Sequence, residues 1–341
     1  MWKNTAIPLW AVLARILPLH SLWRLADKPL IAICWHAIGT ADELPHIRHL
    51  YTPHTCKQFA QDLDWLLDHF EPLSLEEVCA IAQGKQSCRH PACWISFDDG
   101  LRQVYEYAWP QLQRRGVPFT VFLNSAFIDN ADLFFRYKAS LLIDHWLQSP
   151  PAVTTQRAIK AVLPRHLANN LPHSLLRIGF RQKKWLDSIA HLLHFDFKQW
   201  LTKYQPYLTQ TQIRQMACAG VTFGGHSHTH PLYSQLSLDE QLEQTQKSMA
   251  CMSALVPDQQ CRPFAFPFTD YGISSRFFEQ ACHKQLFDCS FGTAGLRHDV
   301  QQGHLQRHPI ERWPYPATQQ IPAALAWQIL LRFLGRAYLK H

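Results

Sequence analysis

The sequence lacks several patterns that mark common functional classes. Its ten cysteines include no pair separated by two residues, which argues against a zinc knuckle. There is no dense run of lysine and arginine and no nucleic-acid-binding motif, so we expect no nucleic acid partner despite the net charge of +7. Internal repeats and low-complexity tracts are also missing. What remains, with 47% hydrophobic and 17% charged residues over 341 positions, is typical of a globular protein.

The N-terminal region has neither a clear signal peptide nor an apolar run long enough to span a bilayer. Residues 6–14 are apolar, but Pro8 interrupts them and basic residues follow closely. We treat residues 1–27 as an N-terminal amphipathic segment. The scattered cysteines favour a reducing compartment. We therefore expect a cytoplasmic protein, peripheral at the inner membrane, and keep export as the alternative.

The C-terminal region, residues 316–341, has the pattern of a basic amphipathic helix. Arg332, Arg336 and Lys340 recur every four residues among apolar side chains. Such a helix can lie on an anionic membrane surface. It can equally pack on the domain with its basic face in water, and periodicity alone does not separate these two interpretations.

Between these ends, apolar runs alternate with helical patterns, which predicts an α/β fold with a parallel sheet. The helical patterns include residues 56–70, a helix that begins at Ser74, and residues 105–115 and 239–255. A stretch at about 132–215 reads as a helical insertion into a domain spanning 28–315. Strands that end in polar residues predict a complete or incomplete barrel with its active site at the strand ends. The predicted strands are residues 30–36, 93–97, 119–123, 221–225, 263–266 and 286–291.

Two adjacent carboxylates and a histidine pair lie at these predicted strand ends. Asp98 and Asp99 follow a buried strand, and Gly100 then permits a sharp turn. His226 and His230 follow another strand, and their spacing on a helical turn would place both imidazoles on one side. A carboxylate and two imidazoles suit a divalent metal that keeps an open position, with the second carboxylate beside it.

Three motifs carry a family resemblance. Ser-Phe-Asp-Asp-Gly at 96–100, His-Ser-x-x-His at 226–230 and Phe-Ala-Phe-Pro-Phe at 264–268 occur in this order. They resemble the first three motifs of the NodB-homology polysaccharide deacetylases, carbohydrate esterase family 4, and residues 116–123 resemble that family's second core strand. The resemblance covers about 28–130 and 215–315. It implies a distorted (β/α) barrel that removes acetyl groups from sugars with a divalent metal, most often zinc.

The resemblance also implies a role for each residue that matches a motif. Asp99, His226 and His230 would bind the metal, and Asp98 would act as the general base. The backbone N–H of Phe268 would stabilise the tetrahedral oxyanion. These roles agree with the chemistry of metal-assisted hydrolysis.

The sequence departs from the family pattern in the third motif. Many members carry an arginine two residues before the motif's proline, where it orients the base, but this chain has Ala265. Arg262 and Arg307 are the two candidates to take its place.

The later motifs are weaker. The acidic fourth motif is absent from residues 287–291, and the fifth, which supplies a histidine acid in many members, is suggested only by the segment containing His308. The Phe-Ala-x-Pro form and an early strand ending in His36 are similar to the subgroup acting on exopolysaccharides and poly-N-acetylglucosamine. His36 and His308 are therefore the two candidate general acids, and each is equally well explained as a structural histidine.

The remaining candidates would contact substrate: His36, Arg136, Arg307 and Tyr271. We expect a metal-dependent deacetylase of an N-acetylated glycan or an activated sugar precursor. The alternatives are a catalytically impaired glycan-binding module and a membrane-surface assembly factor.

Overall fold

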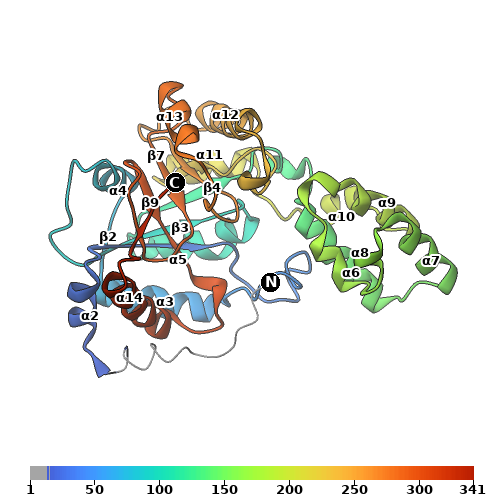
Figure 1. The fold of residues 1–341 in the computed structure, drawn as a ribbon, viewed down its shortest axis with the longest axis horizontal. Helices are drawn as coiled ribbons and strands as arrows, with labels where there is room; N and C mark the ends of the chain where they lie inside the picture. Colours follow the sequence, from blue (N-terminus) through green and yellow to red (C-terminus); the bar gives the residue numbers. More distant parts are fainter. Residues whose placement is uncertain (1–13, 15) are drawn as a thin grey trace.

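The computed structural model describes residue 14 and residues 16–341, and its centre is a parallel sheet wrapped by helices (Figure 1). The strands follow the order β10-β1-β3-β4-β5-β6-β7-β9, with the short β2 added beside β3. Their bounds are β1 Leu30–Trp35, β2 Glu71–Pro72, β3 Ala92–Phe97, β4 Phe119–Leu123, β5 Thr222–Gly225, β6 Pro263–Ala265, β7 Cys289–Gly292, β9 His304–Gln306 and β10 His308–Pro309.

The sheet curves into a nearly closed barrel. Its two edge strands, β9 and β10, are consecutive in the chain, and Arg307 is the only residue between them. The gap between these two edge strands is the seam of the barrel. The chain crosses it at Arg307, from β9 on one edge to β10, which pairs with β1 on the other edge. The predicted α/β barrel is confirmed, and the carboxyl ends of its parallel strands meet at one rim.

Apolar runs located the long strands well. The predicted strand 119–123 matches β4, and four others match within one residue at each end. The strand predicted from Leu286 begins only at Cys289, because the backbone N–H of Leu286 bonds to the carbonyl of Ala281 and closes the preceding helix. The polar strands β9 and β10 were missed, since two or three residues cannot show a period.

Helices cover the outside of the barrel with apolar faces turned inward. Phe59, Leu63 and Leu66 on α3 are buried, at the three- and four-residue spacing of one helix face. Capping boxes begin α3, α4 and α12, including the start predicted at Ser74. The covering helices are α3 Cys56–His69, α4 Leu75–Ala82, α5 Trp109–Arg114 after a π-helical turn at Val104–Ala108, α12 Leu238–Leu255 and α13 Ser275–His283.

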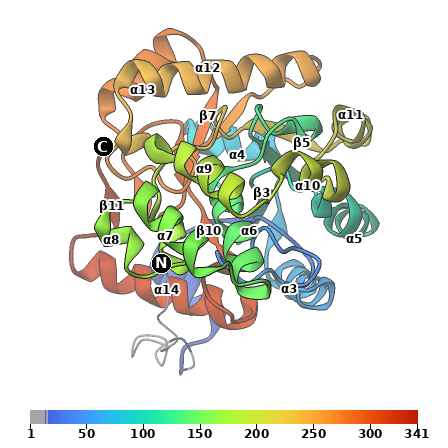
Figure 2. The same cartoon turned by 90° about the vertical axis from the view of Figure 1, so that its right-hand side faces the viewer.

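A helical lobe lies between β4 and β5, where the sequence predicts an insertion. It projects from the barrel in Figure 1 and faces the viewer in Figure 2. Buried Leu142, Ile159 and Leu186 belong to an apolar cluster within it. The lobe consists of α6 Phe135–Gln148, α7 Val153–Val162, α8 Arg165–Ala168, α9 Lys184–Leu192 and α10 Phe197–Tyr204. The next helix, α11 Gln210–Cys218, instead buries Ile213 and Met216 in the main core.

The C-terminal region differs from its prediction. Helix α14 spans Ala317–Phe333 and then stops, so Arg336 and Lys340 lie beyond it, and β11 (Tyr338–Leu339) pairs with β8 (His298–Asp299). The buried face of α14 packs in one core cluster with residues of α2 (Leu19–Ala26) and α3. The rest of the predicted N-terminal segment, residues 1–13 and 15, lies outside the described residues. No helix in the described part of the chain is long and apolar enough to cross a membrane.

A disulfide joins Cys79 on α4 to Cys289 on β7, a pairing that the scattered spacing of the cysteines did not indicate. Cys34 and Cys93, predicted inside buried strands, are buried free thiols.

Candidate active site

The two adjacent aspartates leave β3 through a tight turn. Asp99 and Gly100 both have a positive φ, of 67° and 63°. At residue 100 a Cβ atom would lie 2.6 Å from the Leu123 Cδ2 atom, so the turn needs glycine for conformation and for space. As a result the carboxylates of Asp98 and Asp99 approach the site in different directions, and both are buried.

The histidine pair lies on a loop, so the predicted helical turn is wrong. Residues 226–230 follow β5 without helical hydrogen bonding, and Ser227 and His230 take left-handed conformations, with φ of 67° and 56°. The Ser227 hydroxyl accepts from the backbone N–H of His230 at 3.0 Å and closes the loop. His228, between them, points elsewhere, and its Nδ1 atom lies 2.9 Å from the Ser125 hydroxyl.

Asp99, His226 and His230 converge as predicted. Asp99 Oδ1 lies 3.1 Å from His230 Nε2 and 3.6 Å from His226 Nε2. All three donor atoms lie within 4.8 Å of one another. His226 Nδ1 donates to the Ala265 carbonyl at 2.8 Å, which leaves Nε2 as the acceptor that faces Asp99.

The three residues fit a divalent metal. Asp99 Oδ1 is buried and has no hydrogen-bond partner among the described residues. Burial lowers the pKa of His226 to about 4, which keeps this imidazole neutral at physiological pH. Burial alone would raise the pKa of Asp99, but His230, His36 and His226 together outweigh burial, and the pKa falls well below its usual value. The ionised carboxylate of Asp99 and the neutral imidazole of His226 are forms that bind metal.

Arg307, from the barrel seam, holds Asp98. Its guanidinium donates to both carboxylate oxygens, at 2.6 and 2.9 Å, and to the Ser96 hydroxyl at 3.1 Å. Although burial raises the pKa of Asp98, the guanidinium outweighs that effect and the pKa is lowered. Of the two candidate arginines, Arg307 thus pairs with Asp98, the predicted base. Arg262 lies away from the site and pairs with Asp288.

His36 lies at the end of β1 and is held by Glu311. Its Nδ1 atom is 2.6 Å from a Glu311 oxygen, and the same carboxylate accepts from the backbone N–H groups of His36 and Ala37. Burial would lower the pKa of His36, but Glu311 outweighs burial and raises it to about 9. His36 is therefore a protonated imidazolium at neutral pH, able to donate a proton.

The other candidate acid, His308, points away from Asp98. It follows Arg307 directly, and successive side chains at a strand point to opposite faces. Since Arg307 turns inward to Asp98, His308 turns outward, where its Nε2 atom lies 3.4 Å from Gln320 Oε1 of α14. This geometry favours the structural interpretation of His308.

Phe268, the last residue of the third motif, lies on a strained turn, with a φ of 61°. Its ring lies 4.6 Å from that of His230, so its backbone passes close to the cluster. Arg136 lies 5.7 Å above the Phe268 ring and donates to the carbonyl of Leu176 within the lobe. Tyr271 is exposed, and its hydroxyl accepts from Arg297 at 3.0 Å. Arg136 and Tyr271 therefore lie near the Phe268 turn, and neither is paired with the carboxylate of Asp98 or Asp99 among the described residues.

Sequence reasoning missed Tyr137. This residue lies on α6 at the base of the lobe, and its hydroxyl donates to Asp99 Oδ2 at 2.6 Å. His46 stacks edge-on against its ring at 4.9 Å. The sequence contains no pattern for this contact, because Tyr137 and Asp99 lie on a lobe helix and at a strand end that are far apart in the chain. Its only signal was that Tyr137 is next to the candidate residue Arg136. Through Tyr137, the lobe thus supplies a hydrogen-bond partner to Asp99.

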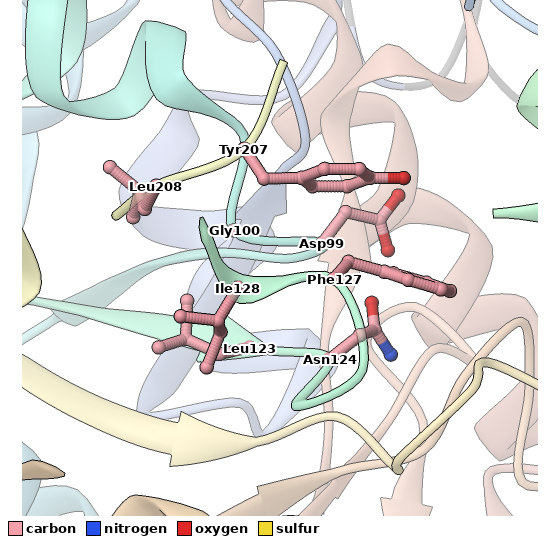
Figure 3. Close-up of a pocket in the computed structure, with 8 residues that line it drawn as sticks. All are labelled: Asp99, Gly100, Leu123, Asn124, Phe127, Ile128, Tyr207 and Leu208. Atoms are coloured by element: carbon pink, nitrogen blue, oxygen red, sulfur yellow. The ribbon is translucent and has the colours of Figure 1, made fainter. Parts of the chain in front are cut away.

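Asp99 also lines a small recess (Figure 3). Its walls are apolar apart from Asp99, Asn124 and Tyr207, and the figure shows the Asp99 carboxylate and the Tyr207 hydroxyl directed to the same side. Asn124 donates to the carbonyl of His226, which ties the end of β4 to the histidine loop.

Comparisons with known proteins agree with this geometry. A family model described as polysaccharide deacetylase matches residues 85–282. A Streptococcus pyogenes deacetylase, PplD, has a similar structure, with a TM-score of 0.54 and 15% identity over 86% of this chain and 97% of that one. IcaB from Ammonifex degensii has a TM-score of 0.53 and 17% identity over 88% and 97%. A de-N-acetylase from Aggregatibacter actinomycetemcomitans has a TM-score of 0.50 and 14% identity over 86% and 99%. No curated protein matches the sequence.

Proposed function

Because the chain belongs to the polysaccharide deacetylase family, we propose that it is a metal-dependent hydrolase that removes acetyl groups from N-acetylated sugars. One observation carries the proposal: an ionised, arginine-bound Asp98 lies beside the cluster of Asp99, His226 and His230. The first supplies a base, and the second supplies three ligands for a metal with an open position.

Asp99, His226 and His230 would hold a divalent cation, for which we propose zinc. When bound, such an ion lowers the pKa of a water and polarises a carbonyl oxygen. Tyr137 donates to the Asp99 oxygen Oδ2 and so orients Oδ1 toward the two imidazoles. Partners of this kind commonly change metal affinity 10–100-fold.

Asp98 takes the proton of the attacking water. Arg307 contributes in two ways, since it keeps Asp98 ionised and fixes its orientation through two parallel hydrogen bonds. The charge of Arg307 is itself completely buried, so Arg307 and Asp98 each compensate the cost of burying the other's charge.

His36 donates a proton to the leaving amine. Its side chain is 27% exposed and Glu311 holds its Nδ1 atom, so Nε2 remains for the substrate. Among the described residues, the backbone N–H of Phe268 donates to no protein acceptor, and the ring of the same residue lies beside His230. This N–H suits a developing oxyanion.

The names of the fold neighbours support the proposed substrate class. PplD is named a deacetylase and the Aggregatibacter protein a de-N-acetylase. We extend this to an exopolysaccharide or cell-surface glycan, or its activated precursor, as the substrate of this chain.

Acetate release tests the proposal. Zinc- or cobalt-loaded protein should release acetate from N-acetylglucosamine oligomers or acetylated glycan precursors, and Asp98→Asn should abolish the release. Asp288→Asn, which changes a carboxylate outside the site, is the matched control. Tight glycan binding without turnover by the metal-loaded protein would instead identify a binding module, the alternative that the missing fourth motif favours.

We also propose that the protein lies on the inner face of an anionic membrane, in the cytoplasm, where lipid-linked precursors occur. Leu330, Phe333 and Leu334 form an exposed apolar surface at the end of α14, beside Arg332. Phe333→Ser should reduce retention on vesicles that contain phosphatidylglycerol, whereas Val153→Ser, an exposed apolar position on the lobe, should not. Equal retention of both variants would contradict this placement, and recovery of the protein outside the cell would favour export.

A further inference from the structure

A second group of metal-ligating side chains lies apart from the cluster at Asp99. Asp270 follows β6, Asp299 ends β8, His304 begins β9 and His341 follows β11. The structure gathers these residues at the side of the barrel where the C-terminal segment returns to β8. The proposed deacetylation uses none of them.

The spacing of their ligand atoms matches a four-coordinate site. His304 Nε2 lies 3.1 Å from Asp270 Oδ2 and 3.9 Å from Asp299 Oδ2. His341 Nε2 lies 3.7 Å and 3.0 Å from the same two oxygens. Ligands held 2.0–2.1 Å from a tetrahedral zinc ion are separated by about 3.4 Å. The four measured distances scatter around this value.

Both imidazoles present Nε2 because other groups engage the rest of the ring. The Ser290 hydroxyl lies 2.8 Å from His304 Nδ1, and His341 has a hydrogen bond with the backbone of Ile273. Histidines oriented in this way by a second partner are characteristic of metal sites. The side chains of His304 and Asp299 are completely buried and that of Asp270 is nearly so. Two carboxylates buried together need positive charge nearby.

Gln306 is hydrogen-bonded to both carboxylates. Its amide Nε2 donates to Asp299 at 2.9 Å and to Asp270 at 2.5 Å, and it lies 3.1 Å from His304 Nε2. The amide oxygen accepts from the backbone N–H of Ala294 at 2.8 Å, which fixes this orientation. An amide carries no net charge, so it bridges the two carboxylates without neutralising them.

We propose that Asp270, Asp299, His304 and His341 bind a second divalent cation of the zinc class. Four protein ligands leave no open position, so the site is structural, unlike the three-ligand cluster at Asp99. Its effect is to fasten the C-terminal segment to the barrel through His341.

The second site also lies close to the turn of Phe268. Asp270 is two residues further along the chain and accepts from the backbone N–H of Thr293 at 3.4 Å, while the Thr293 hydroxyl donates to the Phe268 carbonyl at 2.8 Å. A cation held by Asp270 therefore steadies the loop whose backbone N–H faces the acetyl group in the proposed function.

Metal stoichiometry tests the proposal independently of activity. Zinc-loaded wild-type protein, freed of excess zinc by gel filtration, should contain about two ions per chain by elemental analysis. His341→Ala should contain about one and unfold at a lower temperature. His283→Ala, which removes an exposed histidine on α13, is the matched control and should keep both ions.

The first cluster supplies the second arm of the experiment. The double variant His226→Ala/His230→Ala should keep one ion, and with cobalt in place of zinc it should show the intense visible absorption of tetrahedral coordination. If this variant keeps none, or if His341→Ala binds as much zinc as the wild type, the four residues are a metal-free hydrogen-bond network and the proposal is overturned. The double-variant arm does not require His341→Ala to fold.

Discussion

Replacing Glu311 by glutamine should move the alkaline limb of the pH–activity profile. In the native protein the Glu311 carboxylate lies 2.6 Å from His36 Nδ1, and it outweighs burial to raise the imidazole pKa from 6.5 to about 9. Glutamine keeps the shape and an acceptor oxygen but removes the charge. Burial then dominates, and the pKa should fall to 6.5 or below.

The size of the effect follows from the protonated fraction of His36. At pH 7.5 an acid with a pKa of about 9 is almost completely protonated, whereas one with a pKa of 6.5 is only about 9% protonated. We therefore expect kcat/KM at pH 7.5 to fall about tenfold in Glu311→Gln, with little change at pH 5.5. A cation at Asp99 lowers the pKa of His36 in both proteins, so the difference between them remains.

The assay is acetate release measured from pH 5 to pH 10, with kcat/KM plotted for each protein. Glu279→Gln, an exposed carboxylate on α13, controls for the change of net charge. Because Glu311 also accepts two backbone N–H groups, circular dichroism should confirm that the variant folds. An alkaline limb at the same pH in Glu311→Gln and wild type would refute the assignment of His36 as the acid.

Three further predictions concern neighbours of the cluster. Arg307→Lys keeps the charge but loses the two-pronged contact with Asp98, so kcat should fall about 10–100-fold with KM nearly unchanged in steady-state assays. Tyr137→Phe removes the donor to Asp99 and should weaken zinc binding about 10–100-fold in chelator competition, and unchanged affinity would contradict this role. Gly100→Ala forces a Cβ to within 2.6 Å of a side chain on β4 at a φ of 63°, and denaturant unfolding should show a loss of about 1–3 kcal/mol.

Much of the site could be predicted because its strongest signals are local. A buried strand followed at once by Asp98 and Asp99 is visible in a short window, as is the strand before His226. Because alternating strands and helices form a parallel sheet, the carboxyl ends of the strands meet at one rim, and no knowledge of long-range contacts is needed to predict this. The three candidate metal ligands could therefore be placed together from the sequence, although the backbone conformation between His226 and His230 could not be predicted.

The partners of these residues could not be predicted in the same way. Glu311 contacts His36 across 275 positions, and Tyr137 reaches Asp99 from a lobe helix. Neither contact leaves a period or a spacing in the sequence. The conformation of the histidine loop could not be predicted either. Ser227 and His230 have left-handed backbone conformations, and these bring the two imidazoles together on a loop, as a helical turn would also do.

The absence of an arginine at position 265, where this chain has Ala265, is related to the position of Arg307. Ala265 is buried in the cluster of apolar residues that also contains Phe122, and the Arg307 guanidinium lies 5.0 Å above the ring of Phe122. A small residue on β6 leaves this space to a long side chain arriving from the seam between β9 and β10. The buried guanidinium is then paired by Asp98 and Ser96, so the burial of its charge is compensated. An arginine missing from position 265 is thus no argument for impaired catalysis, because Arg307, from the seam between β9 and β10, supplies an arginine contact to Asp98, the proposed base.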